Sequence, residues 1–189
     1  MKVISGQWGG QAIPGKSTEK LRPTSDKLKE SIFNILESHW VEDWEEFRVL
    51  DLFAGLGSLG IEALSRGAKK ATFVDSHLIS TRRLQESLQQ FEVAPEQANV
   101  ICRGALDSIS WLHQKGAKFD LIFMDPPYRE DWIVPVLNRI KIKPILSSKG
   151  VVVAEHDKRE SLSAAEGFWK LEDARRFGDS AISIFSRAK

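Results

Sequence analysis

Short apolar runs alternate with amphipathic stretches along this chain of 189 residues. The apolar runs at 47–53, 71–75, 99–102, 119–124 and 150–155 have the length of buried strands. Between them, apolar residues recur at helical spacing over 28–36, 61–64, 78–91, 107–115 and 132–140. Strands that alternate with helices predict an α/β fold, with a mainly parallel sheet covered by helices on both faces.

The two ends of the chain break this alternation. Residues 3–13 are rich in glycine and predict a hairpin, with Trp8 near its turn. Residues 168–171 and 181–185 are two strands without a helix between them, which predicts an antiparallel hairpin at the C-terminus. We expect an N-terminal hairpin extension over 1–20 and one larger domain over 21–189.

Composition places the chain among ordinary globular proteins, at 42% apolar and 28% charged residues. We see neither a secretory signal at the N-terminus nor an apolar run of membrane-spanning length, so we expect a cytoplasmic protein without a membrane. The single cysteine, Cys102, lies in an apolar run and is expected to be a buried core thiol. The four histidines are not at metal-ligand spacing, so no metal is expected.

Charge alone does not identify a nucleic-acid-binding protein here. The net charge is +1, although residues 1–30 hold six Lys and Arg against three acids. A small excess of this kind is compatible with RNA binding but does not establish it.

The candidate chemistry centres on Asp125-Pro126-Pro127-Tyr128, which follows the apolar run 119–124. In an open α/β sheet, ligands bind at the carboxyl ends of the strands. Asp125 can accept a hydrogen bond from an amino group, the prolines fix the loop, and Tyr128 offers a face for a planar base. The four residues therefore predict a slot for an amino group on an aromatic ring.

A second motif predicts a nucleotide-like ligand. The strand 47–53 runs into Gly55-Leu56-Gly57-Ser58-Leu59-Gly60 and then a helix, which is the context of a ligand-binding glycine turn. Asp75, at the tip of the next strand, has the position that holds ribose hydroxyls.

Glycine turns of this kind serve both NAD and S-adenosylmethionine. Asp51 precedes Gly55 by four residues, where a carboxylate favours a cationic ligand over a pyrophosphate. Asp125-Pro126-Pro127-Tyr128 has no evident role in hydride transfer, and we expect no second catalytic domain. These features favour the methyl donor S-adenosylmethionine over NAD.

These motifs resemble those of the class I S-adenosylmethionine-dependent methyltransferases. Residues 51–57 resemble the first motif, Asp75 the second, and residues 125–128 the fourth motif of the amino-methylating branch. Residues 4–8, 21–26, 29–34, 64–68 and 177–181 further resemble the RsmD family of 16S ribosomal RNA guanine-N2 methyltransferases. The resemblance covers nearly the whole chain in the same order.

The resemblance implies a Rossmann-like sheet of seven strands, mostly parallel with an antiparallel last strand, and an N-terminal hairpin that helps to bind RNA. The catalytic group is then Asp125, Pro126, Pro127 and Tyr128. The implied cofactor-binding residues are Asp51, Phe53, Ala54, Gly55, Gly57, Asp75, Ser76, Gly104, Ala105 and Asp125. The implied substrate-binding residues are Trp8, Arg22, Thr24, Tyr128 and Arg129.

Three positions depart from the family pattern. Gly9, Gly10 and Gln11 follow Trp8 where the family usually carries arginine. His77 replaces a frequent aspartate, and Arg103 precedes Gly104-Ala105 where an Asp or Asn often meets the adenine amino group. Asp107 is near enough to substitute in that contact.

The expected partner is 16S ribosomal RNA, within a small-subunit particle, and we expect a monomer. Two alternatives stay open from the sequence. One is an N6-adenine methyltransferase acting on DNA or RNA, and the other is a non-catalytic RNA-binding assembly factor on a methyltransferase scaffold.

Overall fold

Within the part of the chain that the structure describes, five helices and seven strands follow one another in the predicted order. The computed structural model describes residues 1–15, 26–127, 130–160, 162 and 167–188. The helices are α1 (Asp26–His39), α2 (Ser58–Ser65), α3 (Leu78–Gln90), α4 (Ala105–Gln114) and α5 (Ile133–Ile142), with a short 3₁₀ turn η1 (Trp44–Glu46). The strands are β1 (Arg48–Leu52), β2 (Lys70–Asp75), β3 (Ala98–Cys102), β4 (Phe119–Met124), β5 (Leu146–Asp157), β6 (Trp169–Phe177) and β7 (Ser180–Arg187).

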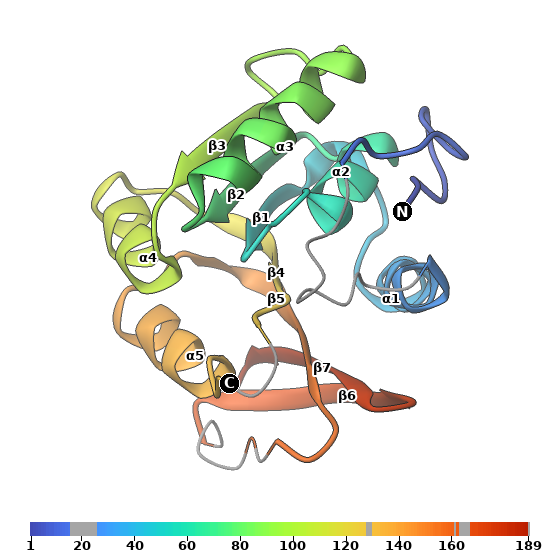
Figure 1. Cartoon of the computed structure of the whole chain (residues 1–189). Helices are drawn as coiled ribbons and strands as arrows, with labels where there is room; N and C mark the ends of the chain where they lie inside the picture. Colours follow the sequence, from blue (N-terminus) through green and yellow to red (C-terminus); the bar gives the residue numbers. More distant parts are fainter. Residues whose placement is uncertain (16–25, 128–129, 161, 163–166, 189) are drawn as a thin grey trace.

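The strands form one sheet of seven, in the order β3-β2-β1-β4-β5-β7-β6 (Figure 1). The first five pair in parallel, so their carboxyl ends meet at one edge of the sheet. β7 pairs antiparallel with both β5 and β6. The predicted Rossmann-like sheet, with its antiparallel last strand and terminal hairpin, is confirmed.

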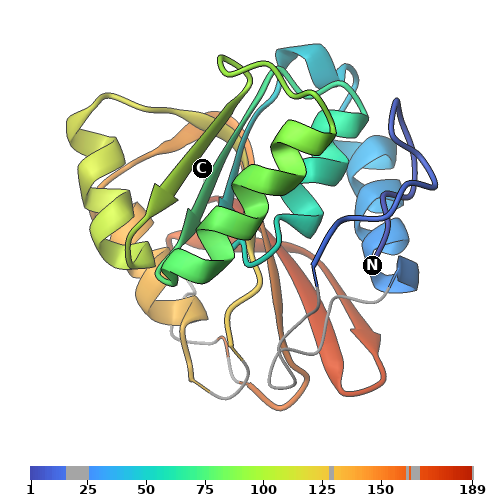
Figure 2. The same cartoon turned by 45° about the horizontal axis from the view of Figure 1, so that its top comes forward.

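Two layers of helices cover the sheet, as Figures 1 and 2 show from two directions. Helices α1, α2 and α3 share one apolar cluster with the side chains of one face of β1 and β4, such as Val49 and Phe123. Helices α4 and α5 share a second cluster with the opposite face, where Leu50 and Met124 lie. The alternation of the two clusters along each strand tells which face a given residue occupies.

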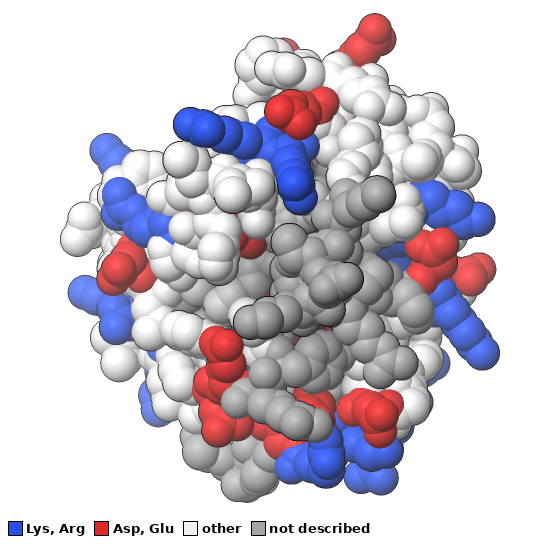
Figure 3. Space-filling view, in the orientation of Figure 1, with Lys and Arg blue, Asp and Glu red and all other residues white. Residues whose placement is uncertain are grey.

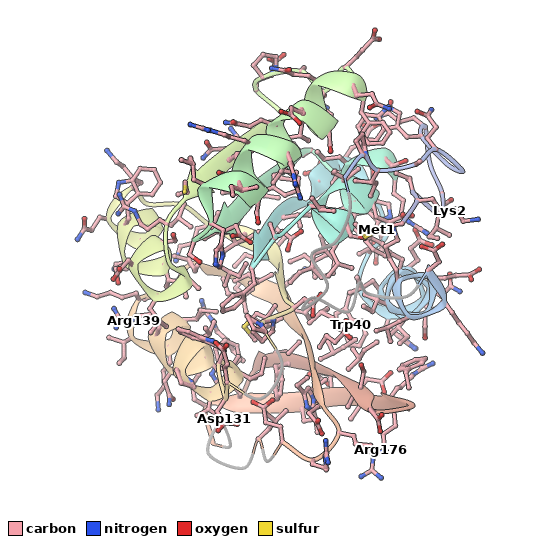
Figure 4. All side chains as sticks on the ribbon, viewed as in Figure 1. Met1, Lys2, Trp40, Asp131, Arg139 and Arg176 are labelled. Atoms are coloured by element: carbon pink, nitrogen blue, oxygen red, sulfur yellow. The ribbon has the colours of Figure 1, made fainter. Side chains whose placement is uncertain are left out.

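The N-terminal segment turns back on itself as predicted, but over a very short length. Lys2 and Ala12 form an isolated antiparallel bridge, and the Val3 N–H donates to the Gln11 carbonyl at 2.9 Å. We call residues 1–15 the arm. Both views place it beside α1 and α2, and Figure 4 shows Met1 and Lys2 there.

The expectation for Cys102 is wrong, because its side chain is exposed. Cys102 ends β3, the outermost strand on its side of the sheet, and β3 contains no fully buried residue. An apolar run therefore marks a strand without marking its burial when the strand lies at a sheet edge. Among the described residues, no helix is long and apolar enough to cross a membrane.

Candidate active site

A row of functional positions crosses the carboxyl edge of the sheet. Leu52 of β1 pairs with Val74 of β2 and with Met124 of β4, and Met124 pairs with Ala154 of β5. The residues one step further along these strands are therefore neighbours. They are, in order across the edge, Asp75, Phe53, Asp125 and Glu155.

The carboxylates of this edge lie toward α1, α2 and α3. Asp51 is the penultimate residue of β1, with Phe73 and Phe123 as its partners in register, and both rings belong to the cluster under these helices. Its Oδ2 accepts from the Gly60 N–H of α2 at 2.9 Å, which confirms the direction of the side chain. The same alternation directs Asp75 to this side, where its Oδ2 accepts from the Gly55 N–H at 2.8 Å.

Burial has a large effect on Asp51, which is only 2% exposed. The pKa of Asp51 is raised from 3.8 to about 7, mainly by removal from water; the Gly60 hydrogen bond lowers it and the nearby charge of Asp75 raises it, and both effects are included in this value. A carboxyl group held in this range favours a cation bound beside it, because a positive charge offsets the cost of its ionisation.

Asp75 also organises the loops on either side of it. Besides Gly55, it accepts from the His77 backbone N–H at 2.8 Å, through Oδ1. The His77 ring lies 3.3 Å from the same oxygen and 3.2 Å from the Ser76 hydroxyl. Ser76 and His77 are exposed, so this corner of the site is open to solvent.

The glycine turn has one open position and one packed position. Gly55 has a φ of +54°, and a Cβ at this residue would meet nothing within 4 Å. Gly57 has a φ of +79°, but a Cβ there would lie 2.4 Å from Leu84 of α3. Gly55 therefore offers space for a ligand, while Gly57 allows α2 and α3 to pack closely.

We expect Gly57→Ala to destabilise the fold by roughly 2 kcal/mol, because it combines a left-handed backbone with a clash against Leu84. Gly104→Ala is the control. Gly104 has an extended ψ of 148° and open space around it, so the stability of this variant should equal that of the wild type. Urea denaturation of both variants measures the difference. Equal unfolding midpoints would contradict the packing role of Gly57.

Phe53 has an unusual backbone for an aromatic residue, with a φ of 64°. Alternation would place its ring on the side of Asp51, but the ring instead packs with the cluster of α4 and α5. There it lies 5.6 Å from the ring of Trp132, which immediately precedes α5. The positive φ thus removes a bulky ring from the carboxylate side of the edge and connects the loop after β1 with the segment before α5.

The loop after β3 forms the end of the row. The Arg103 N–H donates to the Asp75 carbonyl at 2.9 Å, and Gly104 precedes the first turn of α4 with nothing near its missing Cβ. Ala105 is buried. A shallow cleft of about 300 Å³ continues along α4, and it is lined by Arg103, Asp107, Ser110, Trp111 and Gln114. Asp107 therefore faces this cleft beside Gly104.

Asp125 is half-buried at the end of β4, and the Pro126 that follows is buried. Four predicted residues, Tyr128, Arg129, Arg22 and Thr24, lie outside the described residues. Of the predicted cofactor-binding residues, Asp51, Phe53, Ala54, Gly55, Gly57, Asp75, Ser76, Gly104, Ala105 and Asp125 all lie at or next to the carboxyl edge.

Trp8 is not brought to this edge. Its ring packs 5.1 Å from Phe91, just after the end of α3, and its backbone N–H donates to the Ser65 hydroxyl at the end of α2. These helices end at the opposite edge of the sheet, because each returns antiparallel to its strand. The arm then runs back along α2, so that Gly15 approaches Leu56 of the glycine turn.

The charges of the molecule do not form a uniformly basic surface. Figure 3 shows lysine, arginine and acidic side chains interspersed on the face in view. Near the site, Lys158 pairs with Asp179 at 2.9 Å and Arg159 with Asp157 at 2.8 Å. Figure 4 shows Arg176, at the end of β6, at the periphery. Within the described part of the chain, no group of three or more His, Cys, Asp or Glu residues could hold a metal ion.

The sequence prediction missed Glu155. It is only 5% exposed, although it is a carboxylate at the same edge as Asp125. Its signal is a charged residue that directly follows four apolar residues, Val151 to Ala154, near the end of a buried strand.

Comparisons with known proteins agree with this arrangement. The family model described as "Conserved hypothetical protein 95" matches residues 1–186. A relative from Bacillus subtilis, called a putative rRNA methyltransferase YlbH, is 34% identical over 187 residues, covering 99% of this chain and 99% of the relative. A relative from Haemophilus influenzae, called ribosomal RNA small subunit methyltransferase D, is 33% identical over a match that covers 92% of this chain and 87% of the relative.

A solved structure from Escherichia coli, described as the putative methyltransferase yhhF, superimposes with a TM-score of 0.84 at 29% identity. The match covers 99% of this chain and 97% of the other. Sequence and fold agree over nearly the whole length. The chain therefore belongs to the RsmD family, as its motifs indicated, within the class I methyltransferase fold.

Proposed function

We propose that the protein transfers a methyl group from S-adenosylmethionine to the exocyclic N2 of a guanine in 16S ribosomal RNA of the small subunit. The observation that carries this proposal is the placement of Asp125 and its prolines beside the carboxylates and open glycine turn of β1 and β2. The names of the relatives, rRNA methyltransferases, support ribosomal RNA as the substrate. The enzyme acts in the cytoplasm as a monomer.

The residues present suit the methyl donor. The open space at Gly55 and Gly104 accommodates a close approach, and Asp51 and Asp75 favour a cation. Asp75 retains acceptor capacity for ribose hydroxyls beside its bonds to Gly55 and His77. When bound, S-adenosylmethionine supplies an electrophilic methyl group on a sulfonium centre.

Asp125 prepares the acceptor for an in-line displacement. The guanine N2 lone pair is delocalised into the ring, so the amino group is a poor nucleophile. Asp125 and the Pro126 carbonyl accept its two N–H bonds and aim the lone pair at the methyl carbon. As the new C–N bond forms and the C–S bond breaks, its electron pair stays on the sulfur as a neutral thioether, and positive charge develops on N2 beside the Asp125 carboxylate. The carboxylate stabilises this charge until the extra N2 proton passes to solvent. Tyr128 stacks on the base after it is turned out of the RNA.

Labelled donor decides between this proposal and its alternatives. The protein is incubated with tritiated S-adenosylmethionine and, separately, with unmodified small-subunit particles, free 16S rRNA and DNA, and the products are digested to nucleosides. We expect labelled N2-methylguanosine from the ribosomal substrates. Labelled N6-methyladenosine would show that the methylated base is adenine and not guanine. Donor binding without transfer to any substrate would favour an assembly factor.

We expect donor affinity to rise with pH because of Asp51. Below pH 7 the buried carboxyl is mostly protonated, and binding a cation must release that proton, so affinity increases up to about pH 7 and then levels off. Asp51→Asn removes this slope and keeps an acceptor for the Gly60 N–H. Calorimetry from pH 5.5 to 7 measures it, below the range where the donor's own amino group titrates. Parallel pH profiles for the two proteins would contradict the role of Asp51.

Asp51 also makes the stability of the donor-free protein depend on pH. Between its unfolded pKa near 3.8 and its folded pKa of about 7, the folded protein retains the proton of Asp51 that the unfolded chain has lost. The contribution of Asp51 to stability therefore falls as pH rises through this window.

A further inference from the structure

Glu155 is the carboxylate that lies next to Asp125. Met124 of β4 pairs with Ala154 of β5, and Asp125 and Glu155 each follow directly. Neighbouring strands are about 4.8 Å apart, so the two backbones are within one side-chain length of each other.

Alternation places both side chains on the same side of the sheet: Leu121 and Phe123, which precede Asp125 on β4, lie in the cluster under α1, α2 and α3. Val151 and Val153 of β5 lie in the cluster under α1, α2 and α3, whereas Val152 and Ala154 lie in the opposite cluster. The alternation directs Glu155 to the first side, which is also the side of Asp51 and Asp75. The carboxyl edge thus presents two adjacent carboxylates, one half-buried and one 5% exposed.

Two adjacent carboxylates match a specific pattern of hydrogen-bond donors on a ligand. An ionised carboxylate only accepts hydrogen bonds, so two of them in a row match two neighbouring N–H donors. The Watson–Crick edge of guanine offers this pattern, with N1–H beside the N2 amino group. Adenine offers an amino group beside N1, which is an acceptor and would be repelled by a carboxylate.

We propose that Glu155 is a specificity-determining residue of the acceptor site, accepting from the N1–H of the target guanine while Asp125 accepts from its N2 amino group. This inference rests on the proposed function and supplies a structural reason for guanine that the Asp-Pro-Pro sequence lacks. A carboxylate has roughly four acceptor positions, so contacts of Glu155 within the protein coexist with this bond.

The base analogue 2-aminopurine distinguishes the contribution of Glu155 from that of Asp125. It keeps the 2-amino group that is methylated but has no hydrogen on N1, so it satisfies Asp125 and leaves Glu155 facing a lone pair. Sites built to bond a particular N–H reject analogues without it by up to about 10⁴-fold. We therefore expect the wild-type enzyme to prefer guanine by at least ~10²-fold in kcat/KM.

The experiment uses particles reconstituted with 16S rRNA that carries guanosine or 2-aminopurine riboside at the methylated position. Glu155→Gln should lower the preference for guanine to within ~10-fold, because the carboxamide can either accept from N1–H or donate to the bare N1. Asp157→Asn is the matched control: it lies two residues along the same strand face, and Arg159 binds its carboxylate. Its preference should equal that of the wild type.

The outcomes are separable. A wild-type enzyme that methylates both bases equally well, or a preference unchanged by Glu155→Gln, overturns the role of Glu155. Calorimetric donor binding by Glu155→Gln shows that the variant is folded, and the wild-type preference tests the inference even if the variant does not fold. A wild-type enzyme that methylates no guanine in any RNA overturns the proposed function instead.

Discussion

Asp125→Ala should lower kcat by ~10²-fold or more, a loss typical of removing one group that stabilises developing charge. The carboxylate is adjacent to the methyl-accepting nitrogen in the proposed mechanism, and its effect is greatest when that nitrogen becomes positive. The affinity for S-adenosylmethionine should change little, since the donor is held mainly by the turn after β1 and the loops after β2 and β3. Single-turnover methylation of small-subunit particles and donor calorimetry measure the two effects separately.

Two further variants sharpen this prediction. Asp125→Asn keeps an acceptor but loses the charge, so its kcat should fall between those of the wild type and Asp125→Ala. Asp120→Ala removes a carboxylate at the opposite end of the same strand, where it accepts from Arg48, and should leave kcat unchanged. A kcat for Asp125→Ala within threefold of the wild type would eliminate Asp125 as the catalytic group.

The order of strands and helices could be predicted because it depends on local periodicity. Every predicted core strand is present, and the differences at their ends are small except for β5 and β6, which are longer than their apolar runs. The polar residues of β6 and the C-terminal end of β5 are held by pairing with β7, whereas the N-terminal end of β5 pairs with β4 through Leu146 and Phe119. The error at Cys102 has the same origin, because a strand's place at the sheet edge is decided by the fold as a whole.

Site residues could be predicted only where they belong to a single sequence motif. Asp51 lies within an apolar run, and Gly55, Asp75 and Asp125 come at or just after the end of one, so their positions near strand ends could be inferred. Glu155 also follows an apolar run, but its proximity to Asp125 could not be inferred, because the two residues are 30 positions apart in the chain and only the register of β4 and β5 brings them together. The position of Trp8 could not be predicted either, because it depends on contacts between the arm and the ends of α2 and α3.

A buried ion pair under the arm is another long-range feature that a single sequence does not show. Lys29 of α1 and Glu62 of α2 each have fully buried side chains, with 3.3 Å between Nζ and Oε2. Burial lowers the pKa of Lys29, and the charge of Glu62 opposes this effect. Lys29 also donates to the Lys2 carbonyl at 2.5 Å, so the pair connects two helices and the arm.

Glu62 is the centre of this network, because four donors converge on its two oxygens. Oε2 accepts from the Ile4 N–H at 2.6 Å and faces Lys29. Oε1 accepts from the Ser5 N–H at 2.9 Å and from Arg66 Nε at 3.0 Å. Removing this one carboxylate leaves the buried Lys29 ammonium without its counter-ion and two backbone N–H groups without their acceptor.

We therefore expect Glu62→Leu to destabilise the protein by about 3–5 kcal/mol, the range for breaking a buried pair from one side. Lys29→Met should cost less, because Glu62 keeps Arg66 and both amides of the arm. Glu37→Gln is the control: Glu37 also binds Arg66, at 2.7 Å, but its side chain is 39% exposed, so the loss should stay below about 1 kcal/mol. Urea denaturation ranks the three variants.

Hydrogen exchange distinguishes a local role of Glu62 from a general packing defect. If the carboxylate anchors the arm, the Ile4 and Ser5 amides should lose protection in Glu62→Leu under conditions where the amides of β1 and β4 remain protected. Unchanged protection of those two amides would contradict the anchoring role, whatever the total loss of stability. Because Gly15 of the arm approaches Leu56 of the glycine turn, donor affinity should fall together with that protection. This link connects a network remote from Asp125 with the donor site through the arm, in addition to the direct connection through α2, whose Gly60 binds Asp51.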